Sequence, residues 1–120
     1  MFFRDFYVKI LKTRGENTMT INKTQKDGNI IFTLEGRMDV NSSPKFELEF
    51  IPVFDEADDN CCIVLDLEKL TYISSSGLRV LLLGHKKALA KNIFMKLINV
   101  THGVKEILKI TGFADVFNIE

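Results

Sequence analysis

The sequence predicts an α/β fold in which a small mixed β-sheet is flanked by helices. Two observations carry this prediction: a β-hairpin pattern opens the domain, and strand and helix patterns alternate after it. A hairpin pairs antiparallel, whereas strands that are separated by helices pair in parallel and receive helical cover. The predicted order of elements is therefore β-β-α-β-α-β-α, with a possible short last strand.

A hairpin and one helix are predicted for the first half of the domain. Met19–Lys26 is a threonine-rich strand candidate, and Asn29–Gly36 alternates apolar and polar residues as a half-buried strand does. The Asp27-Gly28 pair between them suits the two central positions of a type I′ turn, which both need positive φ. A polar cluster then predicts a helix from Pro44 to about Asp55. Its apolar side is expected to consist of Phe46, Leu48, Phe50, Ile51 and Phe54.

The second half of the domain alternates between strand and helix patterns. An uninterrupted apolar run is typical of a strand that is buried on both faces. The expected elements are such a strand at Cys61–Leu65, a connection at Asp66–Ser76, a helix at Gly77–Lys91 stopped by Asn92, a strand at Ile93–Val100, a helix capped by Thr101 and ended by Gly112, and an apolar tail or edge strand at Phe113–Ile119. The first of these helices is expected to bury one stripe, formed by Leu78, Leu81, Leu82, His85 and Leu89.

The composition disfavours several classes of function. The chain has 120 residues, and its 16 basic residues balance its 16 acidic ones, which disfavours a strongly cationic nucleic-acid binder. The neighbours Cys61 and Cys62 have no spacing for a disulfide framework or a metal site. We therefore expect a cytoplasmic protein with no metal and no cofactor. No apolar run approaches the roughly 20 residues that span a bilayer.

Residues 1–18 are interpreted as an N-terminal extension or linker, and residues 19–120 as the domain. The apolar residues of Met1–Leu11 suit either a short amphipathic helix or an added strand, and Lys12–Thr18 has the composition of a polar linker. Met19 follows directly, so one account places the native start there. The competing account is a docking segment for a partner or a membrane surface.

Three consecutive serines, Ser74, Ser75 and Ser76, precede an amphipathic helix. The free N–H groups of a first helical turn and the helix dipole both favour negative charge at that point. A phosphate on one serine would find donors in place and would add roughly −1.5 to −2 charges. Plain N-capping needs only one of the three hydroxyls, and by itself it is the simpler interpretation.

The residues around these serines resemble the STAS domain family, which includes the anti-sigma factor antagonists and the cytoplasmic domains of sulfate transporters. Val64–Leu83 is similar to the family pattern of an apolar strand, an aspartate, a short loop and a serine-serine-glycine-leucine helix start. Leu34–Asp39, with the helix start that follows it, and Ile98–Phe117 are similar to two further segments of the family. The resemblance covers roughly residues 19–119 and implies the same fold that the periodicity predicts.

The resemblance implies a phosphorylated serine at Ser75, with Ser76 as the adjacent helix cap. The family often has an aspartate before the phosphoacceptor, but this sequence has Ser74 there, so Ser74 stays open as the alternative site. Asp39 matches an aspartate that lies near the phosphoacceptor in the family fold. We expect the partner to contact the residues around the phosphoacceptor, namely Asp39, Ser74, Ser76, Gly77, Leu78 and Arg79.

The implied function is that of an anti-sigma factor antagonist. Its partner would be an anti-sigma factor with serine kinase activity, whose sequestration frees a sigma factor, and a phosphoserine phosphatase would reset the switch. The alternative is a STAS module of a transporter-associated or lipid-trafficking assembly without a phospho-switch. The oligomeric state stays open.

A serine hydrolase is disfavoured, and no catalytic residue is assigned. The Gly-x-Ser-x-Gly pattern is absent, and only His85 and His102 are candidate bases. A P-loop and a GxGxxG motif are absent as well, which disfavours a nucleotide-binding enzyme.

Overall fold

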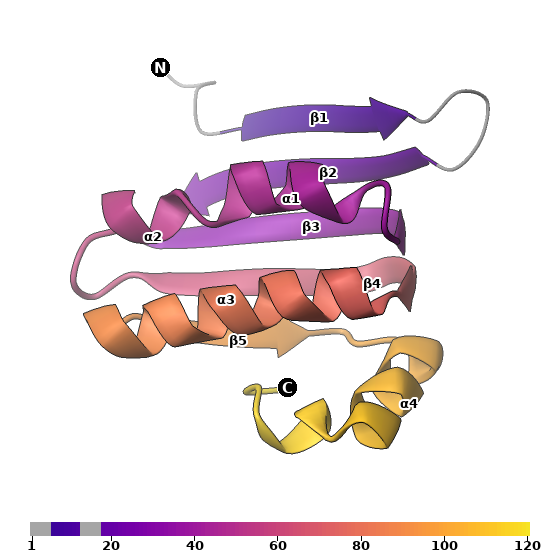
Figure 1. Ribbon diagram of the computed structural model, residues 1–120. Coiled ribbons are helices and arrows are strands. Elements are labelled where there is room, and N and C mark those ends of the chain that lie inside the picture. The colour runs from indigo at the N-terminus through magenta and orange to yellow at the C-terminus, as the bar shows by residue number, and fades with distance from the viewer. Residues whose placement is uncertain (1–5, 13–17) are drawn as a thin grey trace.

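A five-stranded mixed sheet with the strand order β1-β2-β3-β4-β5 forms the centre of the protein. The structure is a computed structural model that describes residues 6–12 and 18–120 (Figure 1). The first three strands pair antiparallel, whereas β4 pairs in parallel with both β3 and β5. The predicted fold class is thereby confirmed. The strands are β1 (Phe6–Lys12), β2 (Thr18–Lys26), β3 (Asn29–Met38), β4 (Cys62–Ile73) and β5 (Phe94–Ile98).

Helices cover one face of this sheet (Figure 1). The helices α1 (Ser43–Phe50), α2 (Val53–Glu56) and α3 (Ser75–Lys91) lie across it, and α4 (His102–Thr111) follows β5 beyond the edge of the sheet. The alternating residues of β3 that face the helices are buried, while their neighbours on the other face are partly or fully exposed. The core therefore lies between the sheet and these three helices, and it extends to Val104 and Leu108 of α4.

A cluster of phenylalanines fixes the distance between the sheet and the helices. The rings of Phe46 and Phe50 of α1 stack at 4.8 Å, and Phe32 of β3 meets Phe50 edge to face at 5.6 Å. Such pairs contribute about 0.5–1.5 kcal/mol beyond the area that they bury. A Cβ atom at Gly84 of α3 would lie 2.5 Å from Cζ of Phe50, so only glycine lets this helix approach the ring.

The prediction of one continuous helix from Pro44 to Asp55 was wrong, because the chain forms two helices, α1 and α2, with a break at Ile51 and Pro52. Pro52 has no N–H group to donate to the carbonyl one turn earlier. The chain instead tightens, because the N–H groups of Phe54 and Asp55 donate to the carbonyls of Ile51 and Pro52, three residues back.

The connection predicted at Asp66–Ser76 is mostly strand, because β4 continues to Ile73. Its second half pairs with the end of β3 after two shifts in register. The extra residues of β4 are accommodated as bulges, and Thr71 donates its hydroxyl to the carbonyl of Gly36 at 3.0 Å. Leu67, Leu70 and Ile73 are buried along this stretch.

Helix α3 begins at Ser75, two residues before the predicted start, and its buried stripe differs from the predicted one. Leu89 is 66% exposed and His85 is half-buried. Gly77 lies against Met38 and Ile73, and Gly84 lies against Phe50 of α1. The buried residues of α3 are Gly77, Leu78, Val80, Leu81, Gly84 and Ala88.

The local stop and turn signals are confirmed. Asp27 and Gly28 have positive φ of 54° and 83°, Asn92 and Gly112 end their helices in the left-handed conformation, and the Thr101 side chain caps α4. The tail after Gly112 forms a 3₁₀ turn over Phe113–Asp115, and the possible last strand is reduced to a single parallel bridge between Ile119 and Leu97 at the edge of β5.

The N-terminal segment supplies an added strand, which was one of its two predicted conformations. β1 pairs antiparallel with β2, with Phe6 opposite Thr24 and Lys12 opposite Thr18. Residues 1–5 and 13–17, the latter being the centre of the predicted linker, lie outside the described residues. The sheet thus has one more strand than the predicted order, and the division into an extension and a domain stays a prediction.

Candidate functional site

The ends of β3 and β4 meet at one edge of the sheet and bring two separate sequence segments together. The N–H group of Ser74 donates to the carbonyl of Met38 at 2.8 Å. Asp39 and Ser75 are the next residues along the chain from these two, so the start of α3 and the turn after β3 form one surface. The roles that the resemblance implies for Asp39 and Ser75 stay predictions.

The three serines have different environments. Ser74 is the N-cap of α3: its backbone is extended, with φ −91° and ψ 175°, and its Oγ accepts a hydrogen bond from the N–H of Gly77 at 3.2 Å. Ser75 is the first helical residue and is exposed, while Ser76 follows it and is half-buried. The expectation that Ser76 caps the helix was therefore wrong, because the strand ends at Ile73 and leaves Ser74 in the cap conformation.

Asp39 organises the turn between β3 and α1. Its carboxylate accepts hydrogen bonds from the N–H groups of Asn41 and Ser42, both at 3.0 Å. The hydroxyl of Ser42 closes the turn, because it accepts from the N–H of Asp39 and donates to the carbonyl of Arg37. Burial alone would raise the pKa of Asp39, but these N–H donors and the Arg37 charge outweigh it and hold the pKa below its ordinary value of 3.8.

Gly77 is required by the packing at the start of α3. A Cβ atom there would lie 2.7 Å from Cγ1 of Ile73 and 2.8 Å from Sδ of Met38. Leu78 is only 4% exposed and belongs to the core. Gly77 and Leu78 therefore hold the helix in place, and the exposed part of the predicted contact surface consists of the serines, Asp39 and Arg79.

Arg79 reaches from α3 to α1. One of its terminal nitrogens, Nη2, lies 2.7 Å from Oε1 of Glu47. The Arg79 side chain is 59% exposed, and that of Glu47 is half-buried at 32%. An ion pair this exposed is weak, typically below about 1 kcal/mol.

Two apolar side chains, which follow Asp39 and Glu47 in the sequence, are exposed, and this was not predicted. Val40, in the turn after Asp39, is 65% exposed, and Leu48 of α1 is 73% exposed. The helix prediction had placed Leu48 on the apolar side. Phe46 and Phe50, four residues apart, define the buried face instead, and the position of Leu48 midway between them was the signal that it points away.

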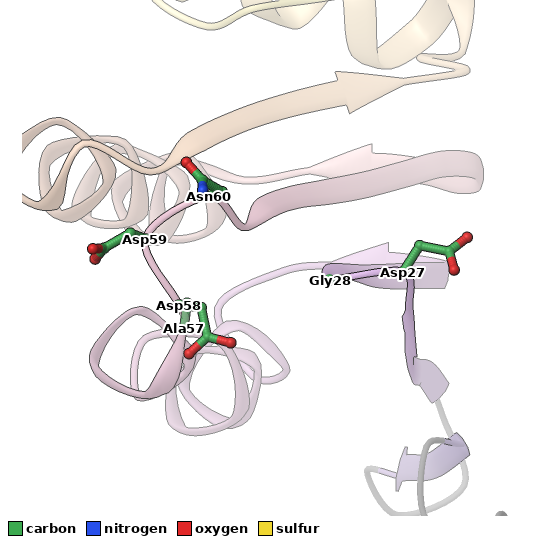
Figure 2. Close-up of a pocket in the computed structure, with 6 residues that line it drawn as sticks. All are labelled: Asp27, Gly28, Ala57, Asp58, Asp59 and Asn60. Atoms are coloured by element: carbon green, nitrogen blue, oxygen red, sulfur yellow. The ribbon is translucent and has the colours of Figure 1, made fainter.

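The acidic loop before β4 lies at the other end of the parallel strands. Figure 2 shows it beside the β2–β3 turn, where the two segments border a hollow of about 580 Å³. The side chains of Asp27, Asp58 and Asp59 point in different directions. Among residues 6–12 and 18–120, no three metal-binding side chains converge. The hollow therefore lacks the features of a metal site.

The two histidines lie apart from the serines. His85 is roughly 15 Å along the helix axis from Ser75, and its ring packs against Phe117 at 5.7 Å. His102 is exposed at the start of α4. The part of the chain that the structure describes holds no helix of the length and apolar character needed to cross a membrane.

Comparison with known proteins identifies the family. The STAS domain family matches residues 20–120, so the chain belongs to that family. The chain is 32% identical over 101 residues to BtrV of Bordetella bronchiseptica, a protein provisionally named as an anti-sigma factor antagonist. The matched residues cover 84% of this chain and 85% of BtrV.

Solved structures share the fold at low sequence identity. An anti-sigma factor antagonist from Mycobacterium paratuberculosis has a TM-score of 0.74 at 19% identity, with 84% of each chain covered. The Bacillus cell fate determinant SpoIIAA in its phosphorylated form has a TM-score of 0.65 at 15% identity, with 83% of this chain and 90% of that chain covered.

Proposed function

We propose that this protein is an anti-sigma factor antagonist whose binding to an anti-sigma factor is switched off by phosphorylation of Ser75. The observation that carries the proposal is the exposed Ser75 at the first position of α3, joined to the Asp39 turn through the hydrogen bond between Ser74 and Met38. The 32% identity to a chain named as an anti-sigma factor antagonist supports the partner class.

Ser75 is a better phosphoacceptor than Ser74 on physical grounds. The Ser74 hydroxyl is half-buried and accepts the N–H of Gly77, so modification there would disturb the cap of α3. Ser75 is exposed, and a kinase reaches it without displacing that bond. In the transfer, the γ-phosphoryl group of ATP moves to Oγ of Ser75, the hydroxyl proton is lost, and ADP leaves.

The phosphate weakens the complex through charge and desolvation. It adds roughly −1.5 to −2 charges to a surface that also presents the exposed apolar side chains of Val40 and Leu48. A partner that covers those apolar groups must also desolvate the phosphate, which is costly without a dedicated cationic site. The kinase in this proposal is the anti-sigma factor itself, and a phosphoserine phosphatase restores binding. SpoIIAA, which shares this fold, has been solved in a phosphorylated form, and this supports the proposed modification.

The proposal is tested by measuring the affinity of three variants for an anti-sigma factor kinase from the same source, by calorimetry without ATP. We expect Ser75→Ala to bind as the unmodified protein does, and Ser75→Glu to bind at least about tenfold more weakly, a difference of about 1.4 kcal/mol. Gln25→Glu is the matched control, because it adds the same charge at an exposed position beside the β2–β3 turn, outside the predicted contact surface, and it should retain binding. Equal affinities of Ser75→Ala and Ser75→Glu would contradict the proposal.

Phosphosite mapping locates the modification independently. The protein is incubated with ATP and a lysate of its source cells, and the peptides that contain the three serines are analysed by mass spectrometry. We expect phosphate on Ser75. Phosphate on Ser74 would contradict the assignment of the residue, and the absence of phosphate in a lysate that phosphorylates another substrate would contradict the switch.

A further inference from the structure

Arg79 lies one helical turn after Ser75 and is held by a carboxylate of another helix. We propose that phosphorylation makes Arg79 change partners: its guanidinium leaves Glu47 of α1 and pairs with the phosphate on Ser75. This inference rests on the proposed phosphorylation of Ser75. In addition to that modification, it assigns Arg79 as the residue that binds the phosphate and Glu47 as the residue that loses its ion pair.

Helix geometry places the two groups within reach. Residues four apart on a helix lie on the same face, with Cβ atoms about 5–6 Å apart. Long side chains on a helix also lean toward its N-terminus, so the Arg79 side chain covers the turn that begins with Ser75. Ser75 is exposed and Arg79 is 59% exposed, so solvent surrounds both groups and no packed side chain needs to move.

The competition between the two anions favours the phosphate. The present ion pair joins Arg79 to Glu47 through a single nitrogen at 2.7 Å, and the Arg79 side chain is exposed while that of Glu47 is half-buried. The phosphate carries up to two charges and three acceptor oxygens, which match the planar donor fork of a guanidinium. An acidic group placed four residues before a basic one is also the favourable order along a helix.

The exchange changes the charge of α1 as well as that of α3. Released from Arg79, Glu47 leaves a negative charge beside the exposed Leu48. One phosphate therefore alters the electrostatics at two points of the proposed contact surface. Uncompensated charge at an interface is a means of excluding a partner, because the partner must desolvate it.

The test uses phosphoserine incorporated at position 75 during translation, so that no kinase is needed. The second ionisation of the phosphate is followed by ³¹P NMR between pH 4 and 8 in the wild-type background and in Arg79→Gln. A neighbouring guanidinium favours the dianion. We therefore expect the acid dissociation constant of the phosphate to be about twofold or more lower in Arg79→Gln than in the wild-type background, so that the titration midpoint of the phosphate moves to higher pH.

Three further measurements complete the test. Glu47→Gln removes the competitor and should move the midpoint to lower pH, whereas Lys86→Gln, an exposed lysine of the same helix, should leave it unchanged. In the wild-type background the amide resonance of Glu47 should shift on phosphorylation, and in Arg79→Gln it should not. Coincident titrations of wild type and Arg79→Gln, or an unmoved Glu47 resonance, would overturn the inference.

The outcome is independent of the binding experiment with Ser75 variants. If the exchange is observed but Ser75→Glu binds the anti-sigma factor normally, the proposed function fails and the exchange stands. If Ser75→Glu releases the partner but the titrations coincide, the proposed function stands and the role of Arg79 fails.

Discussion

Replacing Gly77 by alanine tests whether close packing sets the position of the serines. The added Cβ would lie 2.7 Å from Cγ1 of Ile73 and 2.8 Å from Sδ of Met38. Both of these side chains are almost completely buried, so neither has free space to move into. Met38 is flexible, but Ile73 is β-branched and stiff at χ1. Helix α3 must therefore shift away from the end of β3.

The expected cost follows from known overpacking effects. Methyl-sized insertions into a packed core destabilise by about 1–3 kcal/mol. Exchanging glycine for alanine in a helix gains up to about 1 kcal/mol in propensity, which offsets part of this cost. Gly103 is a matched control, because it also lies in the first turn of a helix and its added Cβ would be 3.8 Å from the nearest atom, the Thr71 carbonyl oxygen.

Urea unfolding of the two variants gives the difference directly, since the gain in propensity largely cancels between them. We expect Gly77→Ala to be about 1–3 kcal/mol less stable than Gly103→Ala, with an unchanged m-value. For an m-value near 2 kcal/mol/M, the midpoint would differ by about 1 M. Stabilities of the two variants within about 0.5 kcal/mol of each other would refute the packing argument.

Two further predictions concern the caps at the same edge of the sheet. Ser74→Ala should lower the free energy of unfolding by about 1 kcal/mol, because it removes the side-chain acceptor for the Gly77 N–H. Ser76→Ala, measured in the same thermal unfolding series, should change it by less than half of that. Equal losses would contradict the assignment of Ser74 as the cap. The pKa of Asp39 is lower in the folded protein than its ordinary value of 3.8, so its carboxylate contributes stability above about pH 4 that is lost as the pH falls through the folded pKa. Asp39→Asn should therefore be less stable than the wild type in urea unfolding at pH 7, and the difference should shrink toward pH 3; a difference that does not depend on pH would count against this explanation.

Much of the fold was predictable because the signals are local. The type I′ turn depends only on the tolerance of Asp27 and Gly28 for positive φ, and both adopt it. Thr101 caps α4 with its own side chain, and Gly112 ends that helix in a conformation that glycine adopts without strain. Each of these features depends only on residues within about four positions of one another in the sequence.

Part of the site was predictable for the same reason. A run of serines before an apolar periodic segment marks a helix start, and the resemblance to the STAS family directed attention to Ser75. Which serine caps the helix was not predictable from the triplet, because each of the three hydroxyls is able to do so. That choice was made by the length of β4, whose last residues pair with β3 through two bulges.

The sequence by itself determined the alternation of strands and helices after the opening hairpin and marked the segment that carries the serines. The tertiary structure alone decided which groups surround them, because those contacts join residues far apart along the chain. It joined Ser74 to Met38, placed Arg79 on Glu47, and left Leu48 exposed while it buried Gly84 against Phe50. The physical reason is that caps and turns are satisfied within a few residues, whereas burial and ion pairing depend on which surfaces pack together after the sheet has formed.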